Sequence, residues 1–168
     1  MSIAESLLPE FDHEMGVTRQ LLESVPDGSA DWKPHQKSMS LGSLAVHLAT
    51  IPTWGGLTMT QTEGDVNPPG GQTYTPPTFE STAGAVKIFD ENVKTARAAI
   101  AAASDGEMMV TWTLKHGGQD IFSMPRVGVL RRLVMNHLIH HRGQLSVYLR
   151  LQDVPLPSIY GPTADTPT

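Results

Sequence analysis

Apolar residues recur at helical spacing in four stretches of the chain, and the first of them begins close to the amino terminus. One face of it carries Leu8, Phe11, Met15, Thr18, Leu22 and Val25. Pro9 decides where this helix starts, because a proline is tolerated in the first turn but removes a hydrogen bond farther in. Ser6 as N-cap places Pro9 in the first turn, whereas a capping box of Ser2 and Glu5 would require a kink. We therefore predict the later start, and an end near Ser24.

Two further helices are predicted before residue 104. Ser40 is the expected N-cap of the second helix, which covers residues 41–51 and meets Pro52, a residue that must kink or stop it. Its apolar face carries Leu41, Leu44, His47, Leu48 and Ile51. The third helix is predicted over residues 78–103. Its apolar positions are Phe79, Val86, Phe89, Val93, Ala96 and Ile100.

The fourth helix is predicted over residues 125–152. Pro125 suits the first turn of a helix, and the Val154-Pro155 pair stops the helix beyond its last turn. Residues 61–77 are rich in Gly, Pro and Thr, which predicts a long surface loop. Residues 110–124 alternate around a Gly-Gly pair, which predicts a hairpin-like excursion and not part of a larger sheet.

Four long helices without a strand-rich half predict an all-α fold, an antiparallel four-helix bundle. A chain of 168 residues is expected to be one domain, here residues 1–168, and to bury roughly two-thirds of the surface that its unfolded form exposes. Such bundles build metal sites from side chains on facing helices. The fold class therefore directs attention to metal-binding residues on the inward faces.

Composition removes several kinds of chemistry. The absence of cysteine excludes disulfides, cysteine-ligated zinc, iron–sulfur clusters and a cysteine nucleophile, so a thiol in the reaction has to come from outside. The net charge of −5 and the lack of a basic block argue against a nucleic-acid partner. No run of apolar residues reaches the length of a signal peptide or a membrane span, so we expect a cytoplasmic protein without a membrane partner.

Two of the seven histidines are expected to face the interior together. We take the direction of Leu130 and Tyr148 as the core side of the fourth helix. At about 100° per residue, His137 and His141 then lie within about 20° of that direction, and His140 lies about 80° away. A pair at i and i+4 presents two imidazoles to one metal ion. Packed core histidines are the alternative, but they would leave several ring nitrogens without partners.

His47 is the candidate third ligand, because it lies on the apolar face of another predicted helix, where a polar ring without a role would be costly. His13, His35 and His116 are expected at the surface. A dinuclear carboxylate site requires Glu-x-x-His on two helices, and the fourth predicted helix contains no Glu. The sequence therefore favours a mononuclear site.

Several motifs together resemble the DinB-like (YfiT-like) metalloenzymes, and the resemblance covers essentially the whole chain. They are Asp31-Trp32-Lys33-Pro34, Ser38-Met39-Ser40-Leu41-Gly42, Leu44-Ala45-Val46-His47-Leu48, His137-x-x-x-His141-Arg142-Gly143-Gln144-Leu145, and Val154-Pro155 with Ile159-Tyr160-Gly161-Pro162. The histidine-rich helix with Arg-Gly-Gln is the most specific of them. The family name is shared by accident with a DNA polymerase and is no evidence of DNA chemistry.

The resemblance implies an up-down-down-up four-helix bundle that frequently forms homodimers. It also implies one divalent metal ion on His47, His137 and His141, the same residues that the helical spacing selects. Three imidazoles suit zinc or nickel, with iron, manganese or copper as alternatives. Relatives with known activity include bacillithiol and other low-molecular-weight thiol S-transferases and a mycothiol-dependent maleylpyruvate isomerase.

Three protein ligands and an open coordination position are typical of catalytic metal sites. We therefore expect a metal-dependent enzyme that transfers a low-molecular-weight thiol to an electrophilic small molecule. A metal-dependent hydrolase and a non-catalytic, stress-associated metal-binding dimer are the alternatives. Among the neighbours of the ligands, Asn136 and Gln144 are candidates for contact with them. Arg142 is expected in solvent, and Trp54 is expected either in the core or as a wall of the pocket.

Overall fold

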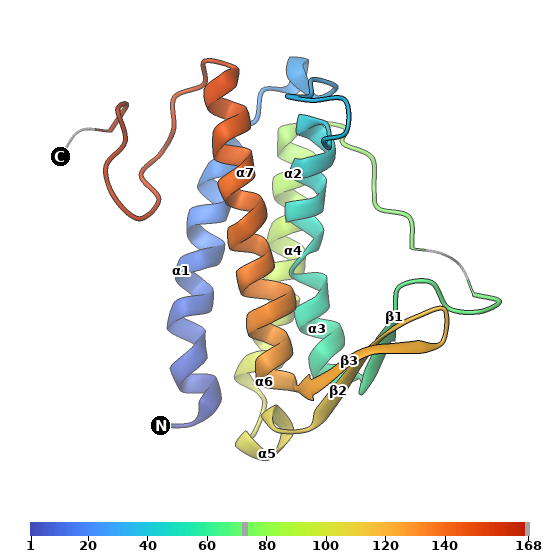
Figure 1. Cartoon of the computed structure of the whole chain (residues 1–168). Helices are drawn as coiled ribbons and strands as arrows, with labels where there is room; N and C mark the ends of the chain where they lie inside the picture. Colours follow the sequence, from blue (N-terminus) through green and yellow to red (C-terminus); the bar gives the residue numbers. More distant parts are fainter. Residues whose placement is uncertain (72–73, 167–168) are drawn as a thin grey trace.

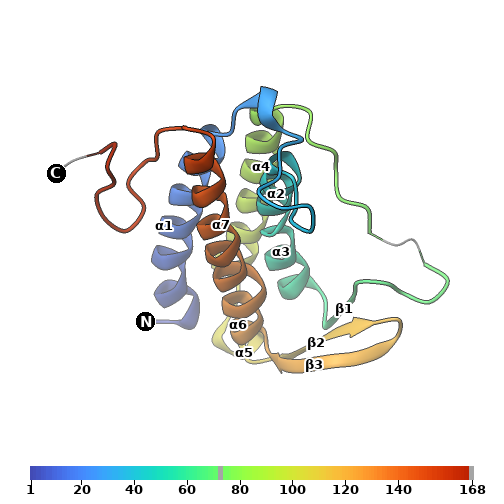
Figure 2. The same ribbon diagram turned by 45° about the horizontal axis from the view of Figure 1, so that its top comes forward.

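The computed structural model describes residues 1–71 and 74–166, and its long helices stand side by side (Figures 1 and 2). These helices, which pack around a common core, are α1 (Ile3–Glu23), α2 (Leu41–Thr50), α3 (Thr53–Thr60), α4 (Thr82–Ala101) and α7 (His137–Leu151). In Figure 1, α1 and α7 run in one direction, whereas α2, α3 and α4 run in the other. A short 3-10 turn, η1 (Asp27–Ser29), follows α1, and α5 (Asp105–Met108) follows α4.

Serine side chains begin three of the long helices. Ser40 and Ser81 each accept a hydrogen bond from the backbone N–H three residues later, at the starts of α2 and α4. The Ser40 start is as predicted. The predicted start of α1 at Ser6 is wrong, because Ser2 forms a reciprocal capping box with Glu5 and Pro9 lies inside the helix.

The early start of α1 extends its buried face by one turn. Ala4 is in the core, and a helix that began after Ser6 would not include it. This apolar burial and the two hydrogen bonds of the capping box offset the loss at Pro9, which lacks an N–H to donate to the preceding turn.

Two of the predicted helices are interrupted. Helix α2 ends before Pro52 and α3 begins directly after it, as the proline predicts. The fourth predicted helix begins after Pro125 and consists of α6 (Arg126–Val129), the π-helical segment η2 (Leu130–Asn136) and α7. The sequence did not indicate η2. It ends immediately before His137, and wide helical turns of this kind often occur at functional sites.

A three-stranded sheet lies at one end of the group of long helices, so the prediction of an all-α antiparallel four-helix bundle is wrong (Figure 2). Strand β2 (Thr111–His116) pairs antiparallel with β3 (Gln119–Pro125), and β1 (Glu63–Asp65) pairs parallel with β2. The hairpin of β2 and β3 was predicted, but its membership of a sheet was not. The predicted loop over residues 61–77 likewise contains β1, and residues 72 and 73 lie outside the described part of the chain.

Side-chain contacts explain why β1 joins the hairpin. The Asp65 carboxylate accepts hydrogen bonds from the backbone N–H groups of Gly117 (3.1 Å) and Gly118 (2.7 Å), which form the hairpin turn. Both glycines have positive φ, which the favoured two-residue turn between antiparallel strands requires. At Gly64 a Cβ would lie 2.8 Å from the Trp112 ring, so glycine is what permits the close approach of β1.

The core lies between the helices and continues to the base of the sheet. Its largest fully buried apolar side chains include Phe11, Phe89 and Trp112. Trp112 of β2 packs edge to face against Trp54 of α3, with ring centroids 6.2 Å apart, and this contact joins the sheet to the long helices. None of the helices in the described residues has the length and apolar composition needed to span a membrane.

A buried ion pair joins α7 to α1, and it corrects the expectation that Arg142 lies in solvent. Only 1% of the Arg142 side chain is exposed, and its guanidinium lies 2.7 Å from the Glu14 carboxylate. The same guanidinium donates to the Glu14 carbonyl and to the Thr18 hydroxyl. The Tyr160 hydroxyl bonds to both charged groups and so ties the C-terminal segment to the two helices.

Replacing Arg142 by Met should reduce the free energy of unfolding by about 3–5 kcal/mol, because the Glu14 carboxylate would then be buried without its partner. The matched control is Arg131→Met. Arg131 of η2, the segment that continues into α7, pairs with Glu10 of α1 at 2.9 Å, but both side chains are about half exposed. The expected loss of unfolding free energy is therefore below about 1 kcal/mol. Urea unfolding in the presence of a chelator measures both effects. Equal losses in the two variants would contradict the assignment.

Candidate metal centre

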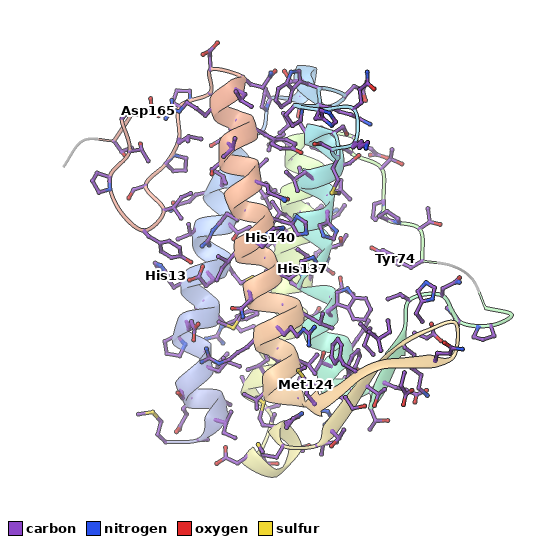
Figure 3. All side chains as sticks on the ribbon, in the orientation of Figure 1. His13, Tyr74, Met124, His137, His140 and Asp165 are labelled. Atoms are coloured by element: carbon purple, nitrogen blue, oxygen red, sulfur yellow. The ribbon has the colours of Figure 1, made fainter. Side chains whose placement is uncertain are left out.

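Two helices position the three histidines predicted as ligands. His47 comes from the second half of α2, His137 is the first residue of α7, and His141 follows one turn later. Figure 3 shows His137 and His140 near the middle of the continuous helical stretch formed by α6, η2 and α7, away from the C-terminal segment around Asp165. Apolar neighbours on the same helices, Leu48 and Leu138, are fully buried and fix the two backbones against the core.

The ring nitrogens of these histidines converge. The Nε2 atom of His137 lies 2.9 Å from Nε2 of His141 and 3.3 Å from Nε2 of His47. One ligand atom from each residue lies within 4.8 Å of the others, so the group could hold a metal ion. The structure thus brings together the residues that spacing selected, while their binding of a metal stays a prediction.

The hydrogen bonding of His137 explains what this convergence requires. The Nε2 atom of His137 faces the Nε2 atoms of both other rings. The Nε2 of a neutral imidazole either donates one hydrogen bond or accepts with one lone pair, so it cannot satisfy two neighbours at once. A cation between the three rings would satisfy all three nitrogens at once.

Two of the three separations between ligand nitrogens fit a transition metal. Imidazole nitrogens bind zinc at about 2.0–2.1 Å, which places two ligand nitrogens roughly 2.9–3.4 Å apart for ordinary coordination angles. The two observed Nε2 separations, 2.9 and 3.3 Å, lie within that range. A set of three imidazoles suits zinc, nickel, copper or iron, whereas manganese prefers oxygen ligands. The donor set therefore fits zinc or nickel well.

The electrostatics keep the three rings neutral, which is the form that binds metal. Burial, together with the neighbouring His141 and His137 rings, lowers the pKa of His47 to about 4. Burial also lowers the pKa of His137 and of His141, although hydrogen bonds to Leu133 and Gln144 oppose the shift. Near neutral pH a metal ion would therefore displace few protons.

The remaining histidines stay outside this group. His140 is exposed, and its ring centroid lies 4.8 Å from that of His141 on the outer side of α7. His13, His35 and His116 are exposed, as expected. Across residues 1–71 and 74–166, no group of three or more metal-binding side chains other than His47, His137 and His141 is found. This agrees with a mononuclear site.

The polar neighbours of the histidines differ from one another in their contacts. Gln144 hydrogen-bonds to His141, with 2.7 Å between Oε1 and Nδ1, as its position one turn later suggested. Asn136 is exposed. Trp54 packs against Trp112, which confirms the core interpretation of this residue. The role of Arg142 was missed, although Glu14 occupies a core position of α1 and a buried carboxylate calls for a cationic partner.

Comparisons with known proteins agree with this fold. The sequence model of the DinB family matches residues 1–168. The uncharacterized protein YrdA of Bacillus subtilis (strain 168) is 28% identical over 166 residues, which cover 96% of this chain and 90% of YrdA. The crystal structure of a DinB-like protein, YjoA, from Bacillus subtilis superposes with a TM-score of 0.69 at 20% identity, covering 92% of this chain and 96% of that one. A DinB-like protein from Bacillus cereus ATCC 10987 gives a TM-score of 0.69 at 23% identity, covering 95% and 98%. Because the family model matches the chain from end to end and the neighbours share its fold, this chain belongs to the DinB family.

Proposed function

We propose that this chain binds one divalent metal ion, zinc or nickel, through the Nε2 atoms of His47, His137 and His141. We further propose that the site serves to transfer a low-molecular-weight thiol to an electrophilic small molecule. The observation that carries the first part is the convergence of three histidine nitrogens, with Nε2 of His137 lying 2.9 Å from Nε2 of His141 and 3.3 Å from Nε2 of His47. The second part rests on the arguments below.

The ligand set favours an ion that keeps its full positive charge. All three side chains of the group are neutral imidazoles, and no carboxylate belongs to it within the described residues. An ion held there would lower the pKa of a thiol in its remaining coordination position, so that a thiolate is available at neutral pH. A carboxylate ligand would weaken this effect by neutralising part of the charge.

A thiol is favoured over water as the activated group. Unperturbed thiols ionise near pH 8.5 and bulk water near pH 15.7, so far less stabilisation is needed to ionise a thiol at neutral pH. The chain has no cysteine, so the thiol would be a separate molecule. In the transfer, sulfur forms a bond to an electrophilic carbon, the leaving group departs with the bonding electrons, and the thiol proton passes to solvent.

The histidines are accessible enough for such a reaction. Each of the three histidines is only partly buried. His140, Gly143 and Gln144, which lie nearby on α7, are exposed. This partial exposure supports access of a small thiol to the group. A metal-dependent hydrolase remains the second candidate, because the same site could bind water. The homodimer that the family resemblance implies stays a prediction.

Replacing His47, His137 or His141 by Ala should each abolish stoichiometric zinc binding, because two imidazoles hold an ion much more weakly than three. His140→Ala is the matched control, since it removes a neighbouring imidazole from the same helix that does not face the group. Elemental analysis after dialysis, on protein without a histidine tag, measures the zinc content. A dispensable His141 together with an essential His140 would contradict the assignment.

Zinc binding should persist to lower pH than is usual for histidine ligands. Protons compete for the same nitrogens, so affinity is lost only as pH falls through the pKa values of the ligands, and these are lowered in all three, to about 4 for His47. Three imidazoles with the ordinary pKa of about 6.5 would lose on the order of 1000-fold in affinity between pH 7.5 and 5.5. We expect a far smaller loss, measured by competition with a chromophoric chelator at each pH. A loss of the full size would indicate exposed, ordinary histidines.

Thiol binding should produce a sulfur-to-metal charge-transfer band when a suitable thiol is added to cobalt-loaded protein. Bacillithiol, mycothiol and glutathione are the probes, and conjugation of the effective thiol to a generic electrophile should be lost in His47→Ala, His137→Ala and His141→Ala. His140→Ala should retain it. Hydrolysis predicts the opposite dependence, an activity that needs no thiol and is inhibited by one. Fully loaded protein that gives neither a band nor conjugation with any of the three thiols would end the thiol proposal.

A further inference from the structure

The side chain of Gln144 lies between two histidines of α7. Its Oε1 atom is 2.7 Å from Nδ1 of His141, and its Nε2 atom is 3.2 Å from Nε2 of His140. Gln144 follows His141 by three residues and His140 by four, so all three side chains project from neighbouring positions on one side of the helix. The contact is therefore local and needs no other element of the fold.

The direction of these hydrogen bonds follows from the chemistry of the ring. Nε2 of His141 faces the other two histidines, 2.9 Å from Nε2 of His137, and must carry a lone pair to bind a metal ion. The single proton of the neutral ring is then on Nδ1 and needs an acceptor. The amide oxygen of Gln144 is that acceptor, at a distance typical of a strong hydrogen bond.

The amide nitrogen of Gln144 lies on the side of His140, 3.2 Å from Nε2 of that exposed ring. With its oxygen toward His141, Gln144 can donate from its NH2 group to Nε2 of His140 when that ring carries its proton on Nδ1, or to solvent when the ring is replaced. A reversed amide would present NH2 to Nδ1 of His141 and force the ring proton onto Nε2, where it would block metal binding.

We propose that Gln144 is a positioning residue, which holds His141 in the tautomer with its proton on Nδ1 and aims its Nε2 at the other two histidines. The value of this tautomer for metal binding rests on the proposed function, but the tautomer itself is a property of the metal-free protein.

The test compares Gln144→Leu with Gln144→Glu. Leucine removes the acceptor, and glutamate keeps a carboxylate oxygen at the same reach. In metal-free protein at pH 8, ¹⁵N chemical shifts of the histidine ring report the tautomer of His141. We expect Nδ1–H in the unmodified protein and in Gln144→Glu, and a mixture of tautomers in Gln144→Leu. The zinc Kd should rise about 10- to 100-fold in Gln144→Leu and change less than about threefold in Gln144→Glu.

Two controls separate positioning from a structural role. Gln144 is exposed, so Gln144→Leu should unfold in urea with the same midpoint as the unmodified protein, as should Gln20→Leu on the exposed face of α1. Gln20→Leu should also leave the zinc Kd unchanged. An unchanged tautomer and Kd in Gln144→Leu, or equal defects in the leucine and glutamate variants, would overturn the proposal. If the unmodified protein bound no zinc, the proposed function would fail, and the ring shifts would still decide the role of Gln144.

Discussion

Three neutral imidazoles from two helices are held within 4.8 Å of one another, and this requires two conditions to be met together. The helices must be fixed at close range, which the fully buried neighbours Leu44, Leu48, Leu138 and Leu145 achieve. The rings must also stay unprotonated, because two imidazolium ions at this distance would repel each other strongly. Partial burial meets the second condition by lowering the pKa values of all three. The same apolar packing thus provides both the geometry and the protonation state of the site.

Much of the helical structure was predictable because its causes are local. Apolar periodicity located the long helices, and Ser40 and Pro52 marked the two ends of α2. The sheet was not predictable for the opposite reason. Glu63-Gly64-Asp65 has neither β-branched nor aromatic residues, and it becomes a strand through long-range contacts such as the hydrogen bonds of Asp65 to the turn of a hairpin more than 50 residues later. The start of α1 was missed because the core position of Ala4 outweighs a local penalty at Pro9.

The candidate site was predictable to the extent that it depends on helical angles. His137 and His141 share one side of α7, and His47 needed only the apolar face of its own helix. The contact of Gln144 with His141 follows from a three-residue spacing on one helix. The burial of Arg142 depends on Glu14, which is 128 residues away, and on Tyr160 in the C-terminal segment. No local pattern links these three positions.

Arg142 directly follows His141, and consecutive residues of a helix point about 100° apart. Helix α7 therefore carries, on adjacent residues, a ligand that faces α2 and a charge that must reach Glu14 on α1. If α7 turned about its axis, the His141 ring and the Arg142 guanidinium would leave their partners together. The buried ion pair thus sets the rotational phase of the helix that presents the histidines. For protein design, grafting only the three histidines onto another helical scaffold would transfer the ligands without the element that aims them.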